Sequence, residues 1–217
     1  TVDITVNKTW VKRETTALPE SVKAALFCTL NGQRTQLDEQ TLSAANNWTY
    51  TWTERNVKND NCQGGAYVVD ETSVAPNFQK TKVSYTDANG YVIENTELTS
   101  QKVIKVWEGD TNQNRPGSIT AELMCGDVVK KTEVLSEANN LDGDNTWEYE
   151  WTNLLVSDCE QGYSVDESIN IPNYQKTVKV LEDGTVVITN EFDNPNTADK
   201  TAASFGRIAG ISSIVLI

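Results

Sequence analysis

Hydrophobic and polar residues alternate in short runs through most of the chain, a pattern that predicts half-buried β-strands. In the N-terminal part of the chain, such runs lie at residues 2–10, 22–30, 48–53, 66–71, 80–86 and 91–95. Asn-Gly pairs at 31–32 and 89–90 are typical of the tight turns between strands. No long stretch before residue 198 has sustained helical periodicity. About seven short strands in roughly 95 residues is the size of a β-sandwich, so the pattern predicts an all-β fold.

The same order of short motifs occurs twice, which indicates a tandem duplication. The matching segments are 6–10 and 103–107, 25–28 and 122–125, 48–53 and 147–152, 67–72 and 163–168, 76–81 and 172–177, and 92–95 and 187–190. The copies are offset by 97 residues at Lys8 and by 95 residues at Asn95, so their loops differ by small insertions and deletions. We therefore predict two tandem β-sandwiches at residues 1–98 and 99–193, followed by an apolar C-terminal tail at 194–217.

The composition excludes several classes of function. The 217 residues include 31 acidic and 18 basic side chains, which gives a formal net charge of −13, whereas nucleic-acid binding needs clustered Lys and Arg. The chain has no His, so Ser-His-Asp triads, Cys-His dyads and most zinc sites are absent. At 38% hydrophobic residues the chain can still form packed cores. We expect no nucleic-acid partner, no metal, no cofactor and no turnover enzyme.

Each predicted sandwich directs three polar side chains into its apolar interior. Because alternate residues of a strand share a face, Lys8 lies on the buried face with the apolar residues at positions 6 and 10. The same alternation turns Glu71 and Asn95 inward. The second copy repeats the set as Lys105, Glu167 and Asn190. A charged Lys in such a place costs several kcal/mol unless it is paired.

Two interpretations of these trios remain open at the level of the sequence. In the first, each trio is a buried Lys–Glu pair with an Asn hydrogen bond, or lies at strand ends where all three groups reach water. In the second, burial leaves the Lys as a neutral amine and keeps the Glu protonated, so that the acid polarises the Asn side-chain carbonyl. The Lys Nζ then attacks the Asn Cγ, ammonia leaves and an isopeptide bond remains. Such a reaction happens once per domain, with Glu71 and Glu167 as the promoting acids.

The four cysteines form two matched pairs. Cys28 and Cys62 are 34 residues apart, and so are Cys125 and Cys159. Equal spacing in the two copies predicts one disulfide per domain, with free buried thiols as the alternative, and disulfides indicate an oxidising, extracellular setting.

Several motifs together resemble those of CnaB-type domains, the immunoglobulin-like stalk modules of Gram-positive surface adhesins and pilins. The motifs are Lys8-Thr9-Trp10, Trp48-Thr49-Tyr50, Tyr67-Val68-Val69-Asp70-Glu71-Thr72 and Val92-Ile93-Glu94-Asn95-Thr96. The second copy contributes Lys105-Val106-Trp107, Asn114-Arg115-Pro116, the segment 163–167 and Ile188-Thr189-Asn190. The resemblance covers about residues 1 to 193.

The resemblance implies that the isopeptide residues are Lys8, Glu71 and Asn95 in the first copy. In the second copy they are Lys105, Glu167 and Asn190. An Asp precedes each of the two acids, at positions 70 and 166, but strand alternation favours Glu71 and Glu167 as the inward residues. The disulfides are an addition to the usual signature of the family.

The polar segment after the second copy resembles a sortase sorting signal of the Asn-Pro-x-Thr-Gly kind. It consists of Asn194, Pro195, Asn196, Thr197 and Ala198, with Ala198 in place of the Gly. By this resemblance Thr197 is the acyl donor that joins the chain to the cell wall or to the next subunit, so sortase and the wall are expected partners. The mostly apolar run that follows is shorter than the ~20 residues that span a bilayer. We expect it to contact the membrane only transiently.

A second interpretation of the tail assumes that it is retained. Residues 211–217 are rich in β-branched types and could add as a strand to a neighbouring copy, which would build a non-covalent filament.

Taken together, these features predict an extracellular structural stalk or pilus subunit of a Gram-positive cell wall. Its partners would be other copies of itself or related surface subunits. The main alternative is an adhesin that binds a host ligand through loops such as 11–18 and 56–65. The absence of His and the use of the buried ionisable groups in self-crosslinking argue against an enzyme.

Overall fold

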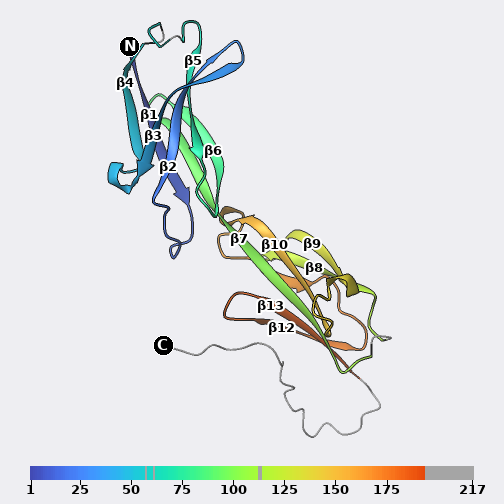
Figure 1. The fold of residues 1–217 in the computed structure, drawn as a ribbon. Coiled ribbons are helices and arrows are strands. Elements are labelled where there is room, and N and C mark those ends of the chain that lie inside the picture. The colour runs from blue at the N-terminus through green and yellow to red at the C-terminus, as the bar shows by residue number, and fades with distance from the viewer. Residues whose placement is uncertain (57, 61, 112–113, 194–217) are drawn as a thin grey trace.

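A computed structural model of the protein describes residues 1–56, 58–60, 62–111 and 114–193. The proposed sorting signal and the apolar tail, at 194–217, lie outside the described residues. The described chain forms two β-sandwiches that follow one another along the strand β7 (Figure 1). The two tandem immunoglobulin-like domains predicted from the sequence are therefore present. No helix in the described part of the chain is long and apolar enough to span a membrane.

The first sandwich consists of a four-stranded and a three-stranded sheet. The four-stranded sheet has the order β6–β7–β1–β4, in which β1 and β7 run parallel, and the three-stranded sheet has the order β3–β2–β5. The strands are β1 (Val2–Val11), β2 (Ser21–Leu30), β3 (Gln33–Ser43), β4 (Thr49–Arg55), β5 (Ala66–Ser73), β6 (Phe78–Thr86) and β7 (Gly90–Glu108).

The second sandwich repeats this topology. Its sheets have the orders β12–β13–β7–β10 and β11–β8–β9, and β13 runs parallel to β7 as β7 does to β1. The additional strands are β8 (Ser118–Cys125), β9 (Val128–Ser136), β10 (Thr146–Leu155), β11 (Ser164–Glu167), β12 (Tyr174–Val180) and β13 (Val186–Phe192). Short 3-10 turns lie at η1 (Ala44–Asn46), η2 (Glu137–Asn139) and η3 (Val156–Asp158).

Strand β7 belongs to both sandwiches. Its N-terminal half pairs with β1 and β6, and its C-terminal half pairs with β10 and β13. The sequence suggests separate strands at 91–95 and 103–107, but the structure joins them. The ladder continues across the junction, because Glu97 lies opposite Phe78 and Leu98 lies opposite Leu155, with one irregularity in register between Thr99 and Gln101.

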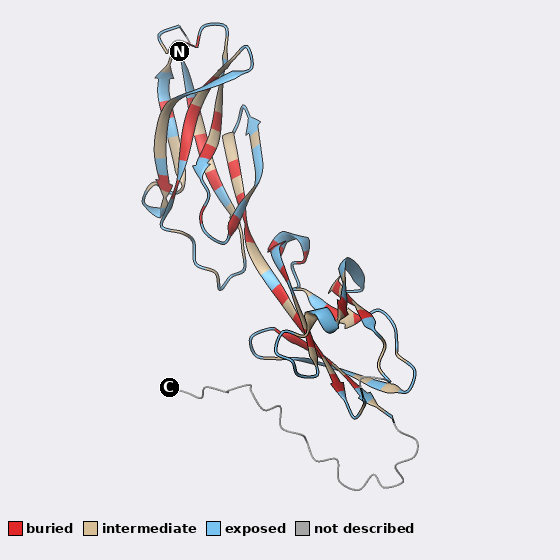
Figure 2. Ribbon diagram, turned by 45° about the vertical axis from the view of Figure 1, so that its right-hand side comes forward, coloured by how far each residue is buried: buried red, intermediate tan, exposed pale blue. Residues whose placement is uncertain are grey.

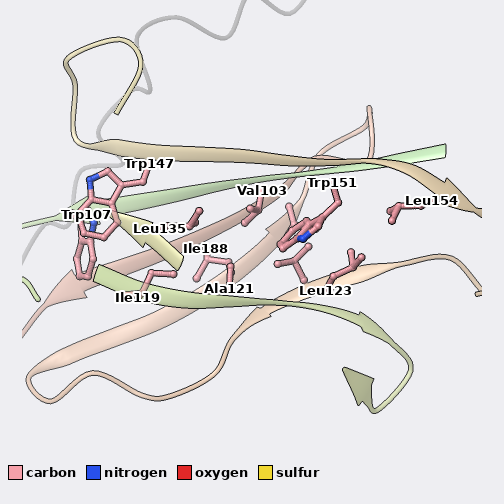
Figure 3. Packing of buried hydrophobic residues seen from close by; sticks show 12 residues of the cluster. Val103, Trp107, Ile119, Ala121, Leu123, Leu135, Trp147, Trp151, Leu154 and Ile188 are labelled. Atoms are coloured by element: carbon pink, nitrogen blue, oxygen red, sulfur yellow. The ribbon is translucent and has the colours of Figure 1, made fainter. Parts of the chain in front are cut away.

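Each sandwich has its own apolar core between its two sheets. The first core includes Val6, Leu26 and Ile93, which are fully buried. In the second core, Trp107 and Trp147 pack edge to face with ring centroids 5.2 Å apart, at one end of a row of side chains that runs to Leu154 (Figure 3). The buried residues lie along the strands of both sandwiches, whereas the connecting loops are largely exposed (Figure 2). The same strands that form these cores direct the polar trios inward.

Strand β3 was not expected from the sequence. Its residues are mostly polar, and only Leu42 among them is fully buried. The strand lies at the edge of the three-stranded sheet, where it needs little apolar surface, so its sequence lacks a clear alternation.

Candidate functional site

The first polar trio comes together between the two sheets of the first sandwich. Lys8 is on β1, Asn95 is on the neighbouring parallel strand β7, and Glu71 is on β5 of the opposite sheet. The register places Lys8 beside Ile93 and Asn95 beside Trp10, so Lys8 and Asn95 are diagonal neighbours on the inner face. All three residues are buried, with exposed fractions of 5%, 8% and 0% for Lys8, Glu71 and Asn95.

The carboxylate of Glu71 lies between the amine and the amide. Its Oε2 is 3.9 Å from Lys8 Nζ, and its Oε1 accepts a hydrogen bond of 3.0 Å from Asn95 Nδ2. The Lys8 amine also donates to the backbone carbonyls of Thr9 and Ile93, at 3.3 Å each. Glu71 Oε2 and Asn95 Oδ1 are buried without a hydrogen-bond partner. The site therefore retains unsatisfied polar atoms at the two groups that a crosslinking reaction would use.

The second trio has the same geometry. Lys105 Nζ is 3.7 Å from Glu167 Oε2, and Asn190 Nδ2 donates to both oxygens of Glu167, at 3.3 and 3.1 Å. The Lys105 amine donates to the carbonyls of Val106 and Ile188, at 3.2 and 3.3 Å. Asn190 Oδ1 is again buried without a partner. The duplication has thus preserved a whole constellation of groups.

Burial shifts the Lys and the Glu of each site toward their neutral forms. Desolvation lowers the pKa of Lys8 to about 8 and that of Lys105 to about 8, although the facing Glu acts in the opposite direction. Desolvation likewise raises the pKa of Glu71 and of Glu167 above the ordinary value, against the effect of the nearby Lys. Each amine also lies 4.3 Å from the ring centroid of the tryptophan two residues further along its strand.

This arrangement supports acyl transfer from the amide to the amine. A neutral Lys is a nucleophile, and a protonated Glu can donate a hydrogen bond to an amide oxygen. A half-turn about the terminal torsion of Asn95 exchanges its Nδ2 and Oδ1, which would bring Oδ1 to the Glu71 carboxyl. In that orientation a protonated acid could polarise the carbonyl for attack by the Lys8 amine.

The aspartates beside the two acids lie outside these constellations. Asp70 pairs with Lys80 and Asp166 pairs with Lys176, so the groups that contact the buried Lys and Asn are Glu71 and Glu167. The sequence reasoning missed these lysines. They lie in the segments 76–81 and 172–177, which match between the two copies, so the comparison of the copies could have shown them.

Both pairs of cysteines form disulfides, Cys28 with Cys62 and Cys125 with Cys159, as the spacing predicts. The first disulfide connects β2 to the segment that precedes β5. A Cβ on Gly65 would lie 2.9 Å from Cys28 Sγ and 2.8 Å from a backbone carbonyl oxygen, so this turn accommodates no larger residue without moving.

One of the two loops considered for ligand binding carries a structural contact. In loop 11–18, the guanidinium and the backbone N–H of Arg13 donate to the carboxylate of Glu97, which is 3% exposed. The loop is therefore fixed to β7 close to the point where the two sandwiches meet. In loop 56–65, positions 57 and 61 lie outside the described residues.

Comparisons with known proteins bear on the same two halves of the chain. A sequence profile of the Cna protein B-type domain matches residues 4–96 and 101–191. A collagen adhesin of Staphylococcus aureus is 30% identical over 157 residues, which are 70% of this chain and only 12% of that protein.

Solved structures with related sequence include a single B repeat unit of the collagen binding surface protein of Staphylococcus aureus. It is 25% identical with a TM-score of 0.39, and the match covers 89% of this chain and 99% of that one. The pilus adhesin SpaC of Lactobacillus rhamnosus GG is 12% identical with a TM-score of 0.39, and the match covers 88% of this chain and 29% of that one.

Proposed function

The chain belongs to the Cna protein B-type domain family, and from this premise we propose that it is an extracellular structural subunit of a Gram-positive stalk or pilus, locked by two internal isopeptide bonds. The observation that carries the proposal is the recurrence of a buried Lys, Glu and Asn in contact with one another in both sandwiches. A single buried Lys–Glu pair would be unremarkable, but an unpartnered amide oxygen beside it in each copy favours a reaction.

The proposed reaction is balanced without any cofactor. In the first sandwich the lone pair of Lys8 Nζ attacks Asn95 Cγ, and Glu71 donates a proton to the carbonyl oxygen. The bond from Lys8 Nζ to Asn95 Cγ forms, and the departing nitrogen leaves as ammonia with the proton that the amine gives up. As the bond from Cγ to Nδ2 breaks, the carbonyl re-forms and its oxygen returns the proton to Glu71. Glu71 ends protonated as it began, so it acts as a proton relay. Lys105, Glu167 and Asn190 perform the same reaction in the second sandwich.

The product suits a mechanical role. Each bond would join the first strand of a sandwich to its last strand, β1 to β7 and β7 to β13, which are parallel neighbours. Because every bond forms once and remains, the domains consume their own side chains and show no turnover. The disulfides close a second loop within each sandwich.

We further propose that the chain is anchored or polymerised through Thr197 in the segment 194–198. The support is the order of its residues followed by an apolar run. Boiling native fibres in detergent tests this proposal, because sortase-joined subunits stay linked, whereas subunits joined by a donated C-terminal strand separate.

Intact-protein mass spectrometry tests the crosslinks. The mass should fall short of the sequence mass by two ammonia molecules and four hydrogen atoms. Lys8→Ala should restore one ammonia and leave the second bond intact, because the two sites lie in separate cores. As a matched control, Lys102→Ala removes a half-exposed lysine that pairs with Glu148 and should not change the number of bonds. A protein of full sequence mass apart from the disulfide hydrogens would refute the isopeptide proposal.

Ligand binding is a second candidate, favoured by the sequence similarity to a collagen adhesin. The chain spans a small part of that protein, so a direct binding measurement with collagen is needed. Saturable binding would make this chain an adhesive module, and its absence would favour the plain stalk.

A further inference from the structure

An ion pair accompanies each buried trio, and it involves the residue next to the acid. In the first sandwich Lys80 Nζ lies 2.5 Å from Asp70 Oδ1, directly before Glu71. In the second, Lys176 Nζ lies 2.7 Å from Asp166 Oδ1, directly before Glu167. Strands of the two facing sheets provide the partners, because Asp70 is on β5 and Lys80 is on β6.

These ion pairs lie beside the reactive amides. In the strand ladder Lys80 is directly opposite Asn95, and Lys176 is directly opposite Asn190. Both β5 and β6 are edge strands of their sheets, as are β11 and β12 in the second sandwich. Each pair therefore bridges the open edge of a sandwich at the level of the reactive amide.

The aspartate also holds the backbone of the acid. Asp70 Oδ1 accepts a hydrogen bond of 2.9 Å from the backbone N–H of Glu71, and Asp166 Oδ1 accepts one of 2.7 Å from that of Glu167. Lys176 Nζ in addition donates to the Glu167 carbonyl at 3.4 Å. The lysine thus connects the edge strand that pairs with the Asn-bearing strand to the backbone of the acid, through one carboxylate oxygen.

The charges of the first pair also act on the trio. Burial is the main cause that lowers the pKa of Lys8, and the nearby acids oppose it. The positive charge of Lys80 adds a smaller effect that lowers this pKa further. Burial is the main cause that raises the pKa of Glu71, and Asp70 adds a smaller effect in the same direction while Lys80 opposes it. The amine is therefore moved toward its reactive form by both its burial and the neighbouring cation.

We propose that Lys80 with Asp70, and Lys176 with Asp166, are positioning residues for isopeptide formation. They hold the acid-bearing strand against the edge strand that pairs with the amide-bearing strand while the bond forms. This inference rests on the proposed function. A half-exposed ion pair has little effect on stability by itself, so its recurrence at the same place in both copies is better explained by the alignment of reacting groups, to which rates are very sensitive.

The duplication provides an internal control for the experiment. Chain recovered unfolded and uncrosslinked is refolded by dilution, and the loss of ammonia is followed over time by mass spectrometry, with peptide mapping to assign each bond. Lys176→Met should slow bond formation in the second sandwich by about tenfold or more, while the first sandwich keeps its rate. Lys80→Met should slow the first sandwich instead, by a smaller factor, because Arg34 still pairs with Asp70 at 3.1 Å. Lys176→Arg should recover most of the rate, because it restores the charge and the hydrogen bond to Asp166.

Two further variants separate positioning from general stability. Lys102→Met removes another half-exposed ion pair of the second sandwich, to Glu148, and should leave both rates unchanged. Asn190→Ala blocks the bond, so the thermal midpoint of the second sandwich can be compared with and without Lys176→Met. Similar midpoints together with a slower reaction support the proposal.

Three results would overturn it. The first is a wild-type rate in Lys176→Met, and the second is an equal loss of rate in Lys102→Met. The third is that Lys176→Met slows only the folding of the second sandwich, so that the bond forms at the wild-type rate in molecules that have already folded. These results differ from failure of the proposed function itself, in which the unmodified chain would lose no ammonia from either sandwich and both proposals would fall.

Discussion

At the scale of single residues, the two trios are unfavourable as long as they remain unreacted. A Lys and a Glu with no exposed side-chain surface meet at 3.9 Å in one site and at 3.7 Å in the other, which are long distances for an ion pair. An amide oxygen beside each pair has no partner. Forming the proposed amide would remove the cation from the core permanently, so the reaction would relieve the cost of burial as it stabilises the fold.

The rate of bond formation should depend on pH through the protonation of the Lys amine and the Glu acid of each site. The reactive form, with a neutral amine and a protonated acid, carries one proton in total, as does the ion pair. The rate should therefore be highest where the pair holds one proton. It should fall by about tenfold per pH unit above the pKa of Lys8 and of Lys105, which burial lowers to about 8. It should also fall at low pH, where the amine stays charged.

Refolding at low pH followed by a jump to a series of higher pH values measures this profile by the loss of ammonia. Glu71→Gln should abolish the reaction in the first sandwich at every pH and leave the profile of the second unchanged. A rate that keeps rising well above pH ~8 would contradict the role of a protonated acid.

The buried Glu97 makes a separate prediction at this scale. Burial alone would raise the pKa of Glu97, but hydrogen bonds from Arg13 lower it below the ordinary value of 4.5. Its stabilising effect is therefore present above pH 4.5 and is lost as the pH falls through the lower pKa of the folded state. Arg13→Ala should lower the free energy of unfolding of the first sandwich by about 1–2 kcal/mol at neutral pH, allowing for the solvent exposure of Arg13.

Chemical denaturation of the wild type and of Arg13→Ala at several pH values measures this difference. It should shrink as the pH falls below 4.5, because protonation of Glu97 removes the interaction in the wild type as well. Lys23→Ala is a matched control, since it removes an exposed pair with Glu39 in the same sandwich. A difference that stays constant with pH would show that Arg13 acts through packing and not through its charge.

At the scale of elements, strand β7 is the feature that joins the molecule. It carries Asn95 of the first site and Lys105 of the second, and the residues between them pair with neighbours from both sandwiches. The two candidate bonds would therefore attach to one strand. No flexible linker separates them.

The sequence was informative where a strand has one buried face. Alternation predicted β1, β2 and β5, and it predicted that Lys8 and Glu71 point inward. It could not predict the polar edge strand β3 or the unbroken course of β7, because both depend on which strands lie alongside. The contact between Arg13 and Glu97 joins residues 84 positions apart, and no local pattern signals it.

Interrupting β7 should uncouple the two sandwiches without affecting either site. We expect a Gly-Ser insertion between Leu98 and Thr99 to break the shared ladder while both ammonia losses persist, because each trio lies within its own core. Small-angle scattering should then show a broader distribution of distances within the molecule. A matched insertion in the exposed loop at Asp142–Gly143 should leave scattering unchanged. Unchanged scattering from the β7 insertion would show that the junction does not depend on this strand.

At the scale of the whole molecule, tension between the ends acts on parallel neighbours. Pulling on β1 toward the N-terminus and on β7 toward the C-terminus shears the ladder that joins them, and β7 and β13 are loaded in the same way. With both bonds formed, a covalent route runs from Lys8 to Asn95, along β7 to Lys105, and on to Asn190. This route bypasses the other strands of both sandwiches, so the crosslinked chain should hardly lengthen.

Single-molecule stretching should reveal this route and the separate effect of the disulfide. The unmodified chain should rupture its attachments before either sandwich unfolds, whereas Lys8→Ala should show one unfolding step, from the first sandwich. The disulfide between Cys28 and Cys62 holds back a loop of 34 residues, so adding a reductant should lengthen that step by about 110 Å, at about 3.3 Å per residue. Lys105→Ala should show the same behaviour in the second sandwich, where the loop is also 34 residues. An unfolding step in the unmodified chain, or a step in Lys8→Ala that does not respond to the reductant, would contradict this description of how the molecule bears force.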